Sequence, residues 1–96
     1  MRKFARKDAN QDAIVETFRG QGASVWIASP LGDGAPDVVV GLNGRAVLVE
    51  IKDGSKPPSA RRLTPDEQAF RSSWRGPYEV IQSVEEAISL CQSMRA

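Results

Sequence analysis

The sequence contains no histidine and only one cysteine, Cys91, among its 96 residues. Without histidine the chain cannot build an imidazole acid–base site, a histidine-bound zinc site, or a Ser–His or Cys–His nucleophile. A single cysteine excludes a disulfide framework within the chain. No apolar run approaches the length of a membrane span, and the N-terminal stretch lacks the apolar segment of a signal peptide. We therefore expect a cytoplasmic protein with no membrane partner.

A strong excess of either charge is also absent, because 13 Lys and Arg residues balance 12 Asp and Glu residues. A chain of this length forms one domain, residues 1–96, with 1–7 expected to be a flexible basic arm. The basic residues gather in two stretches: Arg2, Lys3, Arg6 and Lys7, and then Lys56, Arg61 and Arg62. Two interpretations stay open, namely solvated surface segments or contacts to nucleic-acid phosphates.

Apolar periodicity and turn residues predict an α/β domain with the order α-β-β-β-α-β-α. The predicted elements are a helix over 8–19, strands over 24–28, 37–42 and 45–52, a helix over about 65–74, a strand over 78–82 and a final helix after Ser83. Thr64, Pro65 and Glu67 form a capping box at the start of the second helix. The expected architecture is a mixed central β-sheet flanked by helices.

Asn43 and Gly44 form the strongest hairpin signal in the chain, because β-forming residues flank them on both sides. A two-residue loop at this point places Asp37 directly opposite Glu50, with Cβ atoms roughly 5 Å apart. Lys52 lies two residues after Glu50 and therefore shares its face of the sheet. Two carboxylates and one ammonium group thus converge at the open end of the hairpin.

The rest of the hairpin is apolar on both faces. One face carries Asp37, Val39, Leu48, Glu50 and Lys52, and the other carries Val38, Val40, Val47, Val49 and Ile51. Strands that are apolar on both faces are typical of sheets covered on both sides. We therefore expect helices to cover both faces of the sheet.

Like charges placed directly opposite one another are destabilising, so a cation is expected between Asp37 and Glu50. Carboxylates are hard oxygen ligands that suit Mg²⁺ or Mn²⁺, and the backbone carbonyl of Ile51 offers a further ligand. Lys52 is placed to orient or deprotonate a water, or to offset charge in a transition state. This combination indicates phosphodiester hydrolysis. The alternative is a simple ion pair of Lys52 with one of the acids, in a protein that binds no metal.

Pro36-Asp37 followed by Glu50-Ile51-Lys52 resembles the PD-(D/E)XK nuclease signature. With a leading helix and the helix start Leu63-Thr64-Pro65, the chain resembles the VRR-NUC family of that superfamily. The resemblance implies a restriction-endonuclease-like core and metal-dependent cleavage of DNA. For the small standalone members, from bacteria and phages, it implies a homodimer that cuts branched DNA such as four-way (Holliday) junctions.

The resemblance also implies a role for individual residues. Asp37, Glu50 and the Ile51 carbonyl would bind the metal, and Lys52 would be the catalytic lysine. Gln68 falls where the family places a glutamine near the active site, although an exposed helix residue is an equal interpretation. A carboxylate from the first helix would be Asp8, with Glu16 as the alternative.

Two tryptophans, a glycine-containing loop and the rival functions complete the expectations from the sequence. Trp26 and Trp74 are either base-stacking residues or residues of the core or an interface. Gly32 and Gly34 do not form a nucleotide-binding loop, because no Gly-Lys-Ser/Thr follows, so no nucleotide cofactor is expected. Apart from branched-DNA cleavage, the rival functions are a non-catalytic DNA-binding module and a nuclease for RNA or linear duplex.

Overall fold

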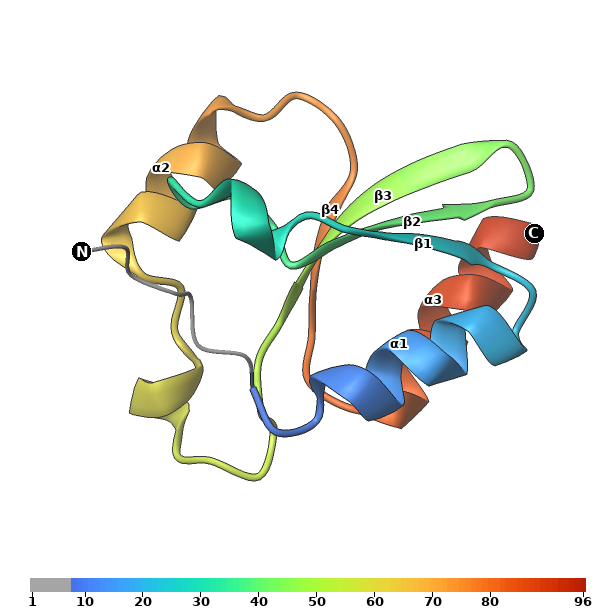
Figure 1. The fold of residues 1–96 in the computed structure, drawn as a ribbon, viewed down its shortest axis with the longest axis horizontal. Helices are drawn as coiled ribbons and strands as arrows, with labels where there is room; N and C mark the ends of the chain where they lie inside the picture. The colour runs from blue at the N-terminus through green and yellow to red at the C-terminus, as the bar shows by residue number, and fades with distance from the viewer. Residues whose placement is uncertain (1–7) are drawn as a thin grey trace.

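The computed structural model describes residues 8–96, so the basic residues Arg2, Lys3, Arg6 and Lys7 lie outside the described part. Figure 1 shows the arrangement of the elements. They are α1 (Gln11–Gly20), β1 (Ser24–Ile27), β2 (Val38–Leu42), β3 (Arg45–Ile51), α2 (Pro65–Ser73), β4 (Tyr78–Ile81) and α3 (Val84–Arg95), with short 3-10 helices at Ser29–Leu31 and Pro58–Arg61. The predicted α/β class and the order α-β-β-β-α-β-α are confirmed.

The four strands form one mixed sheet in the order β1-β2-β3-β4. β1, β2 and β3 are antiparallel neighbours, whereas β4 pairs with β3 in parallel. The turn between β2 and β3 consists of Asn43 and Gly44, both with positive φ, as a two-residue hairpin turn requires. The register pairs Val38 with Val49, which is the register predicted from this turn.

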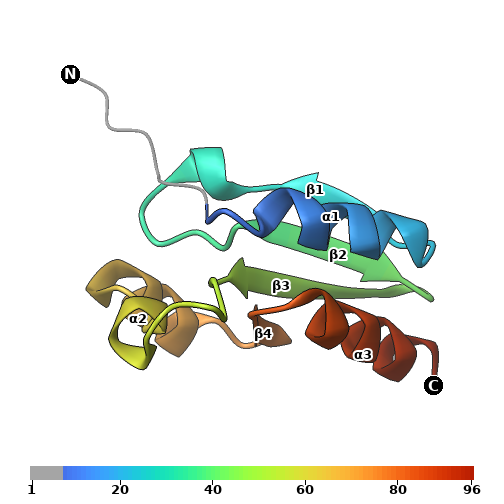
Figure 2. The ribbon, with the colours of Figure 1, turned by 90° about the horizontal axis from the view of Figure 1, so that it is seen from below.

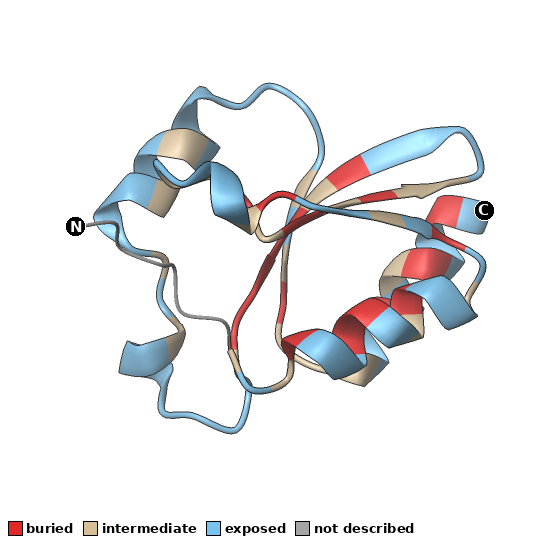
Figure 3. Ribbon diagram, in the orientation of Figure 1, coloured by how far each residue is buried: buried red, intermediate tan, exposed pale blue. Residues whose placement is uncertain are grey.

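The hydrophobic core lies between the sheet and two helices. Figure 2 shows α1 and α3 side by side over the same face of the sheet. Figure 3 shows that buried residues gather along these helices and the central strands. Phe18 and Ile14 of α1 and Cys91 of α3 are fully buried against the strand residues Val38, Val40, Val49 and Ile51. Burial of these apolar side chains is the main source of stability for the domain.

The expectation that helices cover both faces is met on one face only. On the other face Trp26 is 63% exposed, and it is the cross-strand partner of the half-buried Val39. α2 lies beyond the end of the sheet (Figure 2) and has no buried residue. Its aromatic residues Phe70 and Trp74 stack on each other, and Phe70 lies near Tyr78, so they contact the edge strand β4 rather than the sheet face.

α1 begins at Gln11, three residues later than the predicted start at Asp8. The side chain of Asn10 does not cap the helix, because its Nδ2 donates hydrogen bonds to the carbonyls of Lys52 and Gln82, each at 3.1 Å. These bonds fix the segment before α1 against the ends of β3 and β4. None of the helices in residues 8–96 is long and apolar enough to cross a membrane.

Candidate active site

The hairpin brings Asp37 and Glu50 together at its open end. Because Val38 pairs with Val49, the next position along the ladder places Asp37 opposite Glu50. Asp37 lies just before β2, and its Oδ2 accepts a hydrogen bond of 2.7 Å from the backbone N–H of Ile51. This bond fixes the Asp37 carboxylate beside the strand that carries Glu50.

Glu50 is only 3% exposed, and its Oε1 is buried without a hydrogen-bond partner among the described residues. Burial, together with the negative charge of Asp37, raises the pKa of Glu50 from its ordinary 4.5 to about 10. Burial also raises the pKa of Asp37, although the Ile51 N–H opposes that shift. The two carboxyl groups therefore resist being ionised together unless a positive charge joins them.

Lys52 completes the cluster and is 8% exposed. Its Nζ lies 2.9 Å from Oε1 of Glu67 and 3.6 Å from Oε2 of Glu50. Burial lowers the pKa of Lys52, but the hydrogen bond to Glu67 and the surrounding negative charges outweigh burial and raise it overall. Lys52 therefore keeps its positive charge inside the site at neutral pH.

Glu67 is a site residue that the sequence analysis assigned only to helix capping. The capping box with Thr64 is present, and the same Glu67 Oε1 that receives the Thr64 N–H also receives Lys52 Nζ. Burial raises the pKa of Glu67, but its hydrogen bonds with Lys52 and Thr64 lower it overall, so it is ionised. No local signal indicates this role, because it depends on where α2 lies relative to β3.

Asp8 lies outside the pair formed by Asp37 and Glu50. Its Oδ1 is 3.7 Å from Nζ of Lys56, and its negative charge contributes to the raised pKa of Lys52. The alternative, Glu16, is exposed on α1. Within residues 8–96 no group of three or more cysteine or carboxylate side chains is arranged to hold a metal ion. A third carboxylate ligand from Asp8 stays a prediction.

The remaining predicted residues differ in how exposed they are. Gln68 is exposed on α2, next to Glu67, and its catalytic role stays a prediction. Arg61 donates a 2.8 Å hydrogen bond from Nη1 to Oε1 of Gln82, whereas Arg62 is exposed. Contacts of Lys56, Arg61 and Arg62 with a nucleic acid likewise stay a prediction.

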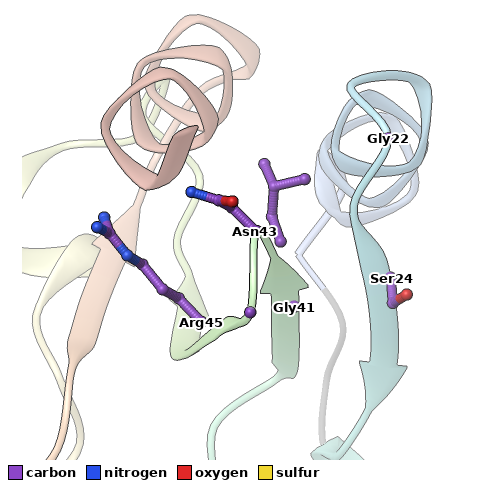
Figure 4. A pocket seen from close by; sticks show the side chains of 7 residues that line it. Gly22, Ser24, Gly41, Asn43 and Arg45 are labelled. Carbon is purple, nitrogen blue, oxygen red and sulfur yellow. The ribbon is translucent and has the colours of Figure 1, made fainter. Parts of the chain in front are cut away.

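A pocket lies at the turn end of the hairpin, away from Asp37 and Glu50. It is lined by Gly22, Ser24, Gly41, Leu42, Asn43, Gly44 and Arg45 (Figure 4). Asn43 donates to the carbonyl of Met94, and Arg45 donates to the carbonyls of Ser93 and Ala96. These side chains donate hydrogen bonds to carbonyl groups at the C-terminal end of α3, where the helix itself offers few further donors. None of the residues that line this pocket belongs to the acidic cluster of Asp37, Glu50, Lys52 and Glu67.

The acidic cluster fits a hard divalent cation. Two carboxylates lie side by side, and one buried oxygen of Glu50 has no hydrogen-bond donor within residues 8–96. Ile51 points its N–H toward Asp37, and in an extended strand the carbonyl of the same residue points to the same side. The available donors are all oxygen atoms, which suit Mg²⁺ or Mn²⁺ rather than a soft metal.

Comparison with known proteins agrees with this arrangement. A solved structure described as a VRR_NUC domain matches the chain with a TM-score of 0.56 and 28% sequence identity, over 85% of this chain and 89% of that chain. No protein-family model matches the sequence, and no curated protein matches it. The match to the solved structure supports a nuclease-type α/β domain. The chain is therefore similar to a VRR_NUC domain in both fold and sequence, and this match confirms the resemblance predicted from the sequence.

Proposed function

We propose that this protein is a DNA endonuclease that hydrolyses phosphodiester bonds with the help of Mg²⁺ or Mn²⁺. One observation carries the proposal: the buried carboxyl group of Glu50 lies beside the half-buried Asp37, and one Glu50 oxygen is without a donor in the described part of the chain. Ionising both of these neighbouring carboxyl groups is costly, and a bound divalent cation offsets that cost.

Asp37 and Glu50 would bind the ion through their side chains, and Ile51 through its carbonyl. When bound, the ion polarises a phosphate oxygen and favours ionisation of a coordinated water. The hydrogen bond from Ile51 N–H holds Asp37 in place before the ion arrives. The buried Lys52 ammonium would orient the attacking water and offset charge that develops on the phosphate. Asp8 and Gln68 are proposed to support this site.

The proposed substrate is branched DNA, cut by a homodimer, as the resemblance to the VRR-NUC family implies. A two-fold dimer presents two active sites to the two strands of a symmetric junction. Its formation is supported by the uncovered face of the sheet, where Trp26 is exposed. The basic residues would contact the phosphate backbone on either side of the cut; they are Arg2, Lys3, Arg6, Lys7, Lys56, Arg61 and Arg62.

The test is a cleavage panel of four-way, flap, splayed, linear and single-stranded DNA, with RNA as a further substrate, in Mg²⁺, Mn²⁺ or EDTA. Asp37→Asn and Glu50→Gln are expected to abolish cleavage while the protein stays folded and retains some DNA binding. Glu79→Gln, on exposed β4 surface, is the matched control and should retain full activity. Full Mg²⁺-dependent activity of Asp37→Asn or Glu50→Gln would rule out the proposed ligands. Light scattering in the same buffer measures the oligomeric state.

The main rival is a DNA-binding module that keeps the fold without catalysis. The two functions differ in their response to metal, because an ion that binds only the folded state raises the melting temperature. A rise in Mn²⁺ that disappears in Asp37→Asn is expected for the nuclease. A melting temperature that Mn²⁺ does not change, together with no cleavage of any substrate, would favour the binding module.

A further inference from the structure

The position of Glu67 links a helix cap to the active-site lysine. Its Oε1 accepts hydrogen bonds from Lys52 Nζ and from the backbone N–H of Thr64, each at 2.9 Å. We propose that Glu67 is a positioning residue, which holds the Lys52 ammonium away from Glu50 and so keeps Glu50 free to bind the metal. This inference rests on the proposed function and adds a residue to its machinery.

The distances around Lys52 give the physical reason. Its ammonium group lies between two carboxylates, at 2.9 Å from Glu67 and 3.6 Å from Glu50. Without Glu67, the nearest remaining carboxylate for this buried ammonium is Glu50. A closer contact between Lys52 and Glu50 would occupy an oxygen that the metal needs, so the ammonium would compete with the ion. Glu67 prevents this competition by providing the shorter ion pair.

The position of Glu67 depends on how α2 packs against the loop before Asp37. α2 buries none of its residues, so its position depends on contacts made at its start and on the aromatic contact of Phe70 with Tyr78. A Cβ atom on Gly34 would overlap the backbone carbonyl of Asp66, which shows how closely the loop packs against the helix. The N-terminal turn of α2 therefore touches the loop that leads to Asp37 and the end of the strand that carries Glu50.

A purely structural role for Glu67 is the alternative, because Glu67 also completes the capping box. Thr64→Ala is the matched control: it removes the hydroxyl that accepts the Glu67 N–H but leaves the Glu67 carboxylate beside Lys52. Both Thr64→Ala and Glu67→Ala weaken the cap, so both should lower the melting temperature. Only Glu67→Ala removes the partner of Lys52.

The experiment measures Mn²⁺ binding by isothermal titration calorimetry without DNA, and separately kcat and KM for a junction substrate. For Glu67→Ala we expect Mn²⁺ affinity and kcat to fall by about 10–100-fold, the usual effect of losing a residue that orients the ligands of a metal site. KM for DNA should stay nearly unchanged. Thr64→Ala should keep wild-type Mn²⁺ affinity and kcat. Glu67→Gln, whose amide oxygen can accept the same two hydrogen bonds, should recover part of the loss.

A double-mutant cycle separates positioning from a direct effect of the Glu67 charge on the ion. In a Lys52→Met background, Glu67→Ala should leave Mn²⁺ affinity unchanged, because there is no ammonium left to position. An equal loss of affinity with and without Lys52, or equal behaviour of Glu67→Ala and Thr64→Ala, would overturn the inference alone. A wild-type protein that binds no Mn²⁺ and cleaves nothing would overturn the proposed function as well.

Discussion

Replacing Glu50 by glutamine should change how the stability of the metal-free protein depends on pH. Glu50 has a pKa of about 10 in the folded protein, against 4.5 as its ordinary value. Between these values the unfolded chain loses the proton while the folded chain retains it. Because the folded state then binds more protons than the unfolded state, the free energy of unfolding falls as pH rises. Glutamine resembles the protonated acid and removes this dependence.

The size of the effect follows from the single proton involved. One extra proton held by the folded state lowers the free energy of unfolding by about 1.4 kcal/mol per pH unit, or about 3 kcal/mol between pH 6 and pH 8. That is a large part of the stability of a small domain, which is typically about 5–15 kcal/mol. Glu50→Gln should therefore be much more stable than wild type at pH 8, and the advantage should shrink toward pH 5.

Urea unfolding in EDTA at pH 6, 7 and 8 measures this directly for the wild type and Glu50→Gln, with Glu79→Gln as the control at an exposed position. The wild type and Glu79→Gln should lose stability together as pH rises. Adding Mn²⁺ at pH 8 should restore stability to the wild type but not to Glu50→Gln, because only the carboxylate binds the ion. Parallel pH profiles for wild type and Glu50→Gln in EDTA would refute the reasoning about Glu50.

Three further outcomes are expected. Mn²⁺ binding at pH 7 should release about one proton, because the ion displaces it from Glu50, and calorimetry in buffers of different ionisation enthalpy should detect it; a buffer-independent heat would contradict this. Asn10→Ala removes the side-chain donor to the Lys52 carbonyl and one of two donors to the Gln82 carbonyl, and should cost about 1–3 kcal/mol in urea unfolding; an unchanged midpoint would contradict it. Gly34→Ala should also lower stability, by about 1–3 kcal/mol, since φ there is +80°, and should slow cleavage; wild-type values would show that the loop adjusts freely.

The hairpin and its charged end could be predicted because their signals are local. Asn43-Gly44 defines a tight turn, and that turn alone sets the register that pairs Asp37 with Glu50. The capping box before α2 is equally local, and it appears where the sequence places it, at Thr64 and Glu67. For these features the nearest residues in the chain determine the structure.

The features that sequence analysis missed depend on distant parts of the chain. Glu67 reaches Lys52 only because the start of α2 lies close to the end of β3, and nothing in the sequence of α2 specifies that position. The predicted start of α1 at Asp8 was wrong because Asn10 bonds to carbonyls 42 and 72 residues away. The uncovered sheet face was missed because Val39 and Leu48 are apolar whether or not a helix lies over them.

The side-chain amide of Asn10 bonds to two residues, Lys52 and Gln82, that the ribosome adds to the chain much later than Asn10 itself. Its two hydrogen bonds reach Lys52, at the end of β3, and Gln82, just after β4. A growing chain that already contains Asp37, Glu50 and Lys52, but not yet β4, has neither the Gln82 bond nor the parallel strand beside β3. The segment that carries Glu50 and Lys52 therefore gains all of these contacts only after β4 and Gln82 have been synthesised.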